Sequence, residues 1–174
     1  MILETQRLIL RKPEEKDVDA YMEFVNSEFV NRYNAMSPVT RETAQARFAQ
    51  AQGDLSTIAM ELKETGKVIG MIYTNEDSLR YGVAAKELSY FLREEEAQKG
   101  YMKEALAELI RHFFTQGNME CISARCFVPN IASQRLLESL GFTREGVLRK
   151  CVKGYRDIVF DDCLYSLMKE DWNQ

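Results

Sequence analysis

The chain has 174 residues, of which 45% are hydrophobic, and its formal net charge at pH 7 is −4. This length favours a single domain over residues 1–174 that can bury a core without disulfides or a metal. The negative balance argues against general nucleic-acid binding, because that binding needs Lys and Arg to neutralise phosphates.

The cysteines and the single histidine argue against a structural zinc site. Cys121, Cys126, Cys151 and Cys163 form no CxxC pair, and His112, within a predicted helix, is expected at the surface. The sequence has no signal-peptide-like start and no run of roughly 20 apolar residues that could span a bilayer. We therefore expect a cytoplasmic protein with free thiols, no metal and no membrane partner.

The first half of the chain predicts a strand, two helices and a β-hairpin. Residues 7–12 alternate as a strand and stop at Pro13, and residues 14–26 carry apolar side chains at helical spacing. Thr40 opens a second helix that runs to about Gln52. Residues 56–62 and 68–74 flank Thr65-Gly66-Lys67, a pattern typical of a hairpin. A polar loop over residues 75–86 leads to the next strand.

The most informative stretch begins with that strand, residues 87–92, and continues into a strongly amphipathic helix after Gly100. Gly117 ends the apolar pattern of this helix. The first N–H groups of a helix lack intrahelical partners and carry the positive end of its dipole. A glycine there lets a phosphate approach closely, so the sequence predicts an anion site at residues 98–100.

The rest of the chain predicts a second central strand, a helix and two more strands. Residues 121–128 form the strand, and residues 129–133 begin a helix that closes on Leu140-Gly141-Phe142. Residues 147–168 predict two strands joined near Lys153-Gly154-Tyr155. These elements predict an α/β or α+β mixed sheet with helices on both faces. They suggest a protein that holds a pyrophosphate and presents the rest of a long cofactor to an acceptor.

In their order, four segments of the chain resemble the acyl-CoA-binding core of the GNAT N-acetyltransferases, in particular the RimJ/RimL-type branch. The segments are TQRLILR at residues 5–11, ELSY at 87–90, QKGYMKEA at 98–105, and NIAS at 130–133 with LGFTREG at 140–146. The resemblance implies a central mixed sheet that splays open between the strand at Glu87 and the strand at Cys121.

The resemblance also implies a set of cofactor-binding residues in this splayed region. The pantetheine arm of acetyl-CoA is expected along the backbone of Tyr90, Phe91 and Leu92, with Asn130 on the pantetheine side and Ser133 near the thioester sulfur. The pyrophosphate is expected on the backbone amides of Gln98, Lys99, Gly100, Tyr101, Met102 and Lys103. Ala97 and Met102 depart from the usual side-chain pattern of this loop, but main-chain donors do not depend on those side chains.

The expected chemistry needs few side chains. Members of the family commonly protonate the departing thiolate from a tyrosine on the second helix, where this chain has Leu137, so Ser133 is the nearest candidate acid. Glu87 is a candidate base for the acceptor, although a strand carboxylate is more often solvated or ion-paired. Weaker candidates for the base are Tyr155, Asp157 and Asp161.

The sequence thus predicts an acetyl-CoA-dependent N-acetyltransferase that acts on a primary amine by direct transfer in a ternary complex. The acceptor is either a protein N-terminal amine or a small amine such as a polyamine or an amino-sugar antibiotic, and its recognition is expected in residues 14–52 and the C-terminal strands. The alternative is a non-catalytic acyl-CoA-binding sensor or scaffold. A homodimer is left open, and a nucleotide-phosphate site is disfavoured because GxxxxGKS/T and GxGxxG are both absent.

Overall fold

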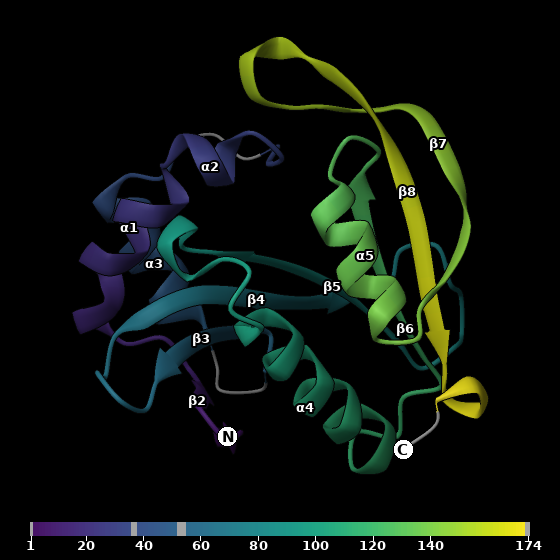
Figure 1. Cartoon of the computed structure of the whole chain (residues 1–174), viewed down its shortest axis with the longest axis horizontal. Coiled ribbons are helices and arrows are strands. Elements are labelled where there is room, and N and C mark those ends of the chain that lie inside the picture. Colours follow the sequence, from purple (N-terminus) through teal and green to yellow (C-terminus); the bar gives the residue numbers. More distant parts are fainter. Residues whose placement is uncertain (1, 36–37, 52–54, 173–174) are drawn as a thin grey trace.

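The computed structural model describes residues 2–35, 38–51 and 55–172. Within these ranges eight strands form one open sheet in the order β1-β2-β3-β4-β5-β6-β8-β7 (Figure 1). The strands are β1 (Ile2–Glu4), β2 (Leu8–Arg11), β3 (Thr57–Leu62), β4 (Val68–Glu76), β5 (Ala85–Leu92), β6 (Cys121–Phe127), β7 (Thr143–Lys153) and β8 (Val159–Met168). Neighbouring strands are antiparallel except for the parallel pair β5 and β6, so the predicted mixed sheet is confirmed.

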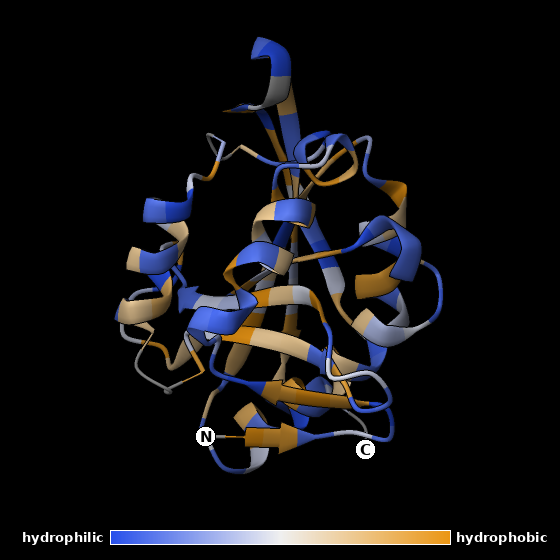
Figure 2. Cartoon of the chain, turned by 90° about the vertical axis from the view of Figure 1, so that its left-hand side faces the viewer, coloured by the Kyte–Doolittle hydropathy of each residue, from blue (hydrophilic) through white to orange (hydrophobic). Residues whose placement is uncertain are grey.

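The helices cover both faces of this sheet, as predicted. They are α1 (Val18–Val25), α2 (Glu28–Asn31), α3 (Arg41–Gln50), α4 (Tyr101–Thr115) and α5 (Ile131–Ser139). None of the helices in the described part of the chain is long and apolar enough to cross a membrane. In Figure 2 the helices carry both hydrophilic and hydrophobic segments, whereas the central strands are largely hydrophobic.

Two hydrophobic clusters lie on opposite faces of the sheet. Successive side chains of a strand point to opposite faces, so on β3 Ala59 joins one cluster and Met60 joins the other. Ala59 packs with residues of α1 and α3, and we call this side the α1 face. Met60 packs in a cluster that includes residues of α4 and α5, and we call this side the α5 face.

Several boundaries differ from the sequence prediction. β1 was not predicted, because three residues are too few for a visible alternation. β5 begins at Ala85 rather than residue 87, and β7 begins at Thr143 rather than residue 147. β7 is exposed along most of its length, so its sequence carries no alternating pattern. The predicted end of α3 near residue 52 lies outside the described residues.

Helix α4 follows the predicted apolar stripe, but the expectation that His112 lies at the surface is wrong. His112 is 6% exposed, within a run that includes buried Leu109 and Phe113. The physical reason is helical spacing: position 112 lies three residues after Leu109 and seven after Ala105, so it shares their core-facing side.

The β5 and β6 strands pair along only part of their length. Four residue pairs join them, from Ala85 with Cys121 to Leu88 with Ala124. Residues 89–92 of β5 and residues 125–127 of β6 continue without pairing to each other, and we call these two segments the β5–β6 opening. The predicted splay between the two central strands is therefore confirmed.

Candidate active site

The start of α4 presents a run of free backbone amides. Among the described residues, no hydrogen bond is made by the N–H groups of residues 98–103, and Glu104 is the first residue whose N–H bonds back into the helix, to the Gly100 carbonyl. Gln98 and Gly100 have φ of 61° and 82°, in the left-handed region. Left-handed residues within such a turn gather successive N–H groups around a concave site for an anion. The predicted anion site thus has a matching backbone geometry.

Arg7, in the loop before β2, holds this helix start in place. Its Nη1 donates to the Lys99 carbonyl at 3.0 Å, and its Nε donates to Glu104 Oε2 at 2.7 Å. The guanidinium also lies 4.4 Å from the centre of the Tyr101 ring. A Cβ on Gly100 would touch Arg7 Nη2 at 3.4 Å, so Arg7 lies directly beside the glycine. Sequence reasoning missed the pair because Arg7 and Glu104 are 97 residues apart.

Glu104 completes the attachment. Its Oε1 accepts hydrogen bonds from the Thr5 hydroxyl at 2.5 Å and from the Arg7 N–H at 2.8 Å. Burial raises the pKa of Glu104, but the bonds from Thr5 and Arg7 together outweigh burial, so the pKa is lowered and the carboxylate stays ionised at neutral pH. The start of α4, which carries the free amides, is therefore fixed to the loop before β2 by Arg7 and Glu104.

The backbone of residues 90–92 has a paired strand on one side of the sheet. These residues pair with Ile72, Met71 and Gly70 of β4. On their other side β6 has already separated, because pairing ends at Leu88. An extended ligand can add to such an edge as a further strand. The geometry suits the predicted pantetheine contact, which stays a prediction.

Two hydroxyl groups meet across the β5–β6 opening on the α5 face. Tyr90 Oη lies 2.8 Å from Ser133 Oγ. Asn130 caps α5 through its Oδ1, which accepts from the Ser133 N–H at 3.2 Å. The serine hydroxyl is therefore not the helix cap and bonds to Tyr90 instead. Burial raises the pKa of Tyr90, so its phenol remains protonated.

Buried neutral side chains surround this hydroxyl pair. Cys126 interacts with Ser133, and burial is the main cause that raises the Cys126 pKa to about 12. The side chain is therefore a thiol rather than a nucleophilic thiolate at neutral pH. Leu137, one turn after Ser133, is fully buried in the cluster of the α5 face. It fills the core at the position where the resemblance implies a tyrosine.

The α1 face carries a separate group of charges. Glu87 of β5 is ion-paired with Arg125 of β6, with Oε2 3.1 Å from Nε and Oε1 3.1 Å from Nη2. Asp162 of β8 is buried on the same face and was not singled out in the sequence, where it is one of two adjacent aspartates. The register of β5, β6 and β8 brings these three residues to one face. This proximity cannot be read from their positions along the chain.

The weaker base candidates lie elsewhere. Asp161 Oδ1 accepts from the Lys150 N–H at 2.7 Å, where the β7 backbone departs from regular pairing with β8. Asp157 is exposed and pairs with Lys153 Nζ at 2.8 Å. The side chain of Tyr155 lies outside what the structure describes. Asp161 therefore has a structural backbone partner, and Asp157 forms a solvent-exposed ion pair.

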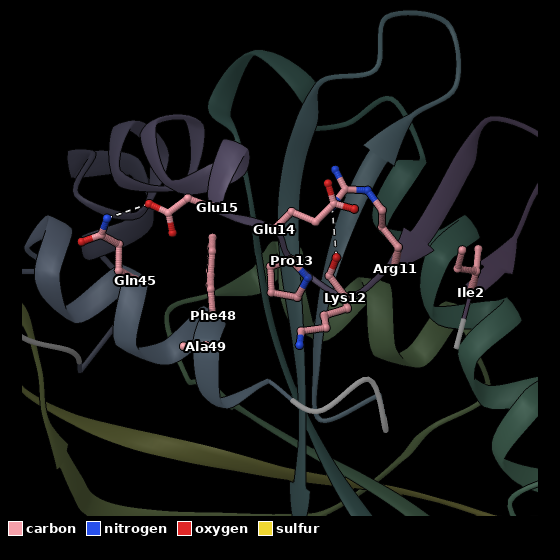
Figure 3. Close-up of a pocket in the computed structure, with 9 residues that line it drawn as sticks. All are labelled: Ile2, Arg11, Lys12, Pro13, Glu14, Glu15, Gln45, Phe48 and Ala49. Carbon is pink, nitrogen blue, oxygen red and sulfur yellow. Dashed lines mark hydrogen bonds and ion pairs between the residues drawn. The ribbon is translucent and has the colours of Figure 1, made fainter.

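A recess of about 550 Å³ lies away from these groups, between the end of β2 and α3 (Figure 3). Two of its polar side chains have partners: Arg11 donates to Asp17 at 2.7 Å, and Gln45 donates to Glu15 at 2.6 Å. It is open, and none of the predicted catalytic or cofactor-binding residues lines it, although part of its lining belongs to residues 14–52, where acceptor recognition is expected. The recess is therefore not the candidate active site.

Comparison with known proteins places this geometry in a family. The model of the acetyltransferase (GNAT) domain matches residues 7–143. An uncharacterized N-acetyltransferase, p20 of Bacillus licheniformis, is 34% identical, and the alignment covers 98% of this chain and 97% of that protein. A ribosomal-protein-serine acetyltransferase of Escherichia coli is 30% identical over 111 residues, 64% of this chain and 60% of that protein. This match agrees with the RimJ/RimL-type resemblance.

A solved structure shows the same fold. Spermidine N-acetyltransferase from Vibrio cholerae, in complex with CoA and spermine, superposes with a TM-score of 0.82 at 19% identity. The match covers 95% of this chain and 97% of that chain.

Proposed function

This chain belongs to the GNAT acetyltransferase family, and on that premise we propose that it moves an acetyl group from acetyl-CoA to a primary amine by direct transfer in a ternary complex. The observation that carries the proposal is the β5–β6 opening, followed directly along the chain by the free amides of residues 98–103. A strand edge and an anion cradle in this order suit a cofactor with a peptide-like arm and a pyrophosphate.

The residues present fit such a cofactor. The amides of residues 98–103 would hold the pyrophosphate, and the φ of 82° at Gly100 would strain any L side chain beside that cradle. The backbone of residues 90–92, with Asn130 and Ser133, would hold the pantetheine arm. Acetyl-CoA supplies the activated thioester. Binding and orientation fall to the backbone and side chains of the protein.

We assign to Ser133 the hydroxyl that assists thiolate departure. It bonds to the protonated Tyr90 hydroxyl, which can hold its orientation and share its proton. Cys126, beside it, is held as a neutral thiol and does not serve as an acyl carrier. This favours direct transfer over a covalent acyl-enzyme.

The proposed acceptor is an amine that must lose a proton before it attacks the thioester. An amine attacks a thioester in its neutral form, so an alkyl amine that is protonated at neutral pH needs a group that takes its proton. Similar proteins are named for a ribosomal-protein serine and for spermidine. We propose that the acceptor is a protein N-terminal amine or a small polyamine-like amine, acetylated in the cytoplasm.

The test is thiol release from acetyl-CoA by the full chain with a panel of amines: spermidine, n-butylamine, and short peptides that begin with Ser or Ala. We expect amine-dependent thiol release. Double-reciprocal plots of the initial rate, with both substrates varied, should give intersecting lines, as a ternary complex requires. Parallel lines in these plots would indicate a covalent acyl-enzyme and contradict direct transfer. Acetyl-CoA binding without amine-dependent release would favour the sensor or scaffold.

A further inference from the structure

Asp162 is a buried carboxylate with an unused acceptor atom. The residue is 4% exposed, and its Oδ1 is buried without a hydrogen-bond partner among the described residues. Buried carboxylates are normally paired or hydrogen-bonded, because leaving an ionised oxygen without a partner in the interior is costly. An unpaired carboxylate oxygen is available to accept a hydrogen bond from a ligand.

The nearby cation does not supply the missing partner. Arg125 is directed to Glu87, with Nε 3.1 Å from one carboxylate oxygen and Nη2 3.1 Å from the other, and no ion pair joins it to Asp162 within the described residues. Burial is the main influence on the pKa of Asp162 and raises it, Arg125 lowers it and Glu87 raises it. The residue that pairs with Asp162 on β7 is Leu148, which is apolar and supplies no hydrogen bond from its side chain. Both Glu87 oxygens are engaged with Arg125, whereas Asp162 Oδ1 has no partner among the described residues.

Asp162 lies next to the β5–β6 opening. It stands directly opposite Phe127, the last residue of β6, in a part of β6 that no longer pairs with β5. Strand alternation and register place it on the α1 face, together with Glu87 and Arg125. Ser133 and Tyr90 lie on the α5 face. The free carboxylate and the candidate proton donor thus approach the opening from opposite faces.

An aromatic pair stands beside the carboxylate. The rings of Phe127 and Phe160 stack with centroids 4.6 Å apart and an interplanar angle of 8°. Phe160 precedes Asp162 by two residues on β8, so both point to the same face. A carboxylate beside aromatic rings in a dry site favours a cation, because the ring faces carry negative charge. An ammonium group is the ligand that matches.

We propose that Asp162 binds the ammonium group of the acceptor amine and removes one proton from it, a role that rests on the acetyltransferase function proposed above. The neutral nitrogen then forms a bond to the acetyl carbonyl carbon while the carbon–sulfur bond breaks. The second nitrogen proton ends on the departing thiolate, and Asp162 returns the first to solvent. One proton is released per acetyl group transferred, so the step balances.

The experiment compares Asp162→Asn with Asp161→Asn in the full chain. The two variants remove the same charge from adjacent positions, but Asp161 lies on the other face and bonds to the β7 backbone. With the best amine of the panel, Asp162→Asn should lower kcat/KM for the amine about a hundredfold, the lower range for a positioned base. KM for acetyl-CoA should stay unchanged. The acidic limb of the pH profile of kcat/KM should disappear, and Asp161→Asn should keep the wild-type profile.

Glu87→Gln separates the two carboxylates of this face. A loss of the acidic limb in Glu87→Gln, with Asp162→Asn within about twofold of wild type, would overturn the proposal and make Glu87 the base. The melting temperature of Asp162→Asn should equal or exceed that of wild type, because the change removes a buried unpaired charge. A large fall in melting temperature would contradict the unpaired state on which the inference rests.

A binding measurement tests Asp162 independently of turnover. Spermidine and n-butylamine, added in the presence of CoA, should raise the wild-type melting temperature and not that of Asp162→Asn. If the wild type is stabilised by amines but releases no thiol, the acetyltransferase function fails and the binding role of Asp162 stands. If neither amine stabilises the wild type, or both stabilise the variant equally, the inference about Asp162 is wrong.

Discussion

Replacing Ser133 by alanine tests the proposed acid on the α5 face. The substitution removes one hydroxyl and leaves Tyr90 Oη without the partner that now lies 2.8 Å away. A buried polar group that loses its partner costs about 1–3 kcal/mol of stability, and the lower end applies to this part-buried pair. No helix cap is lost with it, because Asn130 caps α5 and accepts from the backbone N–H of residue 133. We therefore expect a folded protein with a modestly lower melting temperature.

The effect on turnover should exceed the effect on stability. Positioned proton donors contribute about a hundredfold to ten-thousandfold, and a thiolate is a good leaving group, so we expect a loss of about tenfold to a hundredfold for Ser133→Ala. The assay is the initial rate of thiol release at saturating acetyl-CoA and amine, with the folded fraction measured by circular dichroism. KM for acetyl-CoA should change little.

Tyr90→Phe is the matched control. It removes the same hydrogen bond but keeps the serine hydroxyl, so the rate should fall by a smaller factor than in Ser133→Ala. If Ser133→Ala stays within about twofold of wild type with an intact fold, the serine is structural. If Tyr90→Phe loses as much turnover as Ser133→Ala or more, the phenol is the donor and the reasoning about Ser133 is wrong.

Two further predictions concern the start of α4. Acetyl-CoA at a hundredfold excess over Kd should stabilise the wild type by about 2.7 kcal/mol and so raise its melting temperature, and Gly100→Glu should abolish this rise because a carboxylate would enter the amide run. Gly82→Glu changes another positive-φ glycine that faces open space, and it should keep the rise. An equal loss in both variants would mean that general strain, not the amide run, is the cause. The pKa of Glu104 is lowered in the folded state, so its contribution to stability is present above its ordinary value of 4.5 and is lost as pH falls below it through the folded pKa. When the free energy of unfolding is measured by urea unfolding at a series of acidic pH values, wild type should therefore lose more stability below pH 4.5 than Glu104→Gln. Parallel curves of stability against pH for the two proteins would contradict the lowered pKa of Glu104.

Much of the architecture follows from local sequence. The apolar stripe of α4, the turn at residues 65–67 and the apolar run of β6 are periodic or punctuated signals, and each formed the element it predicts. The run around Gly100 likewise depends on neighbours in the chain, because helix starts and positive φ are local properties. The weak points were elements without a pattern, such as the three-residue β1 and the exposed β7, and the burial of His112.

The side-chain pairs of the candidate site depended on tertiary structure. Arg7 meets Glu104 across 97 residues, and Tyr90 meets Ser133 across 43. Asp162 is indistinguishable from Asp161 in the sequence, yet one residue of register sends them to opposite faces of the sheet. The sequence by itself determined which elements form and where an anion can sit, since both depend on residues within a few turns. Which side chains share a face of the β5–β6 opening depends on how distant strands align, and that alignment exists only once the sheet has formed.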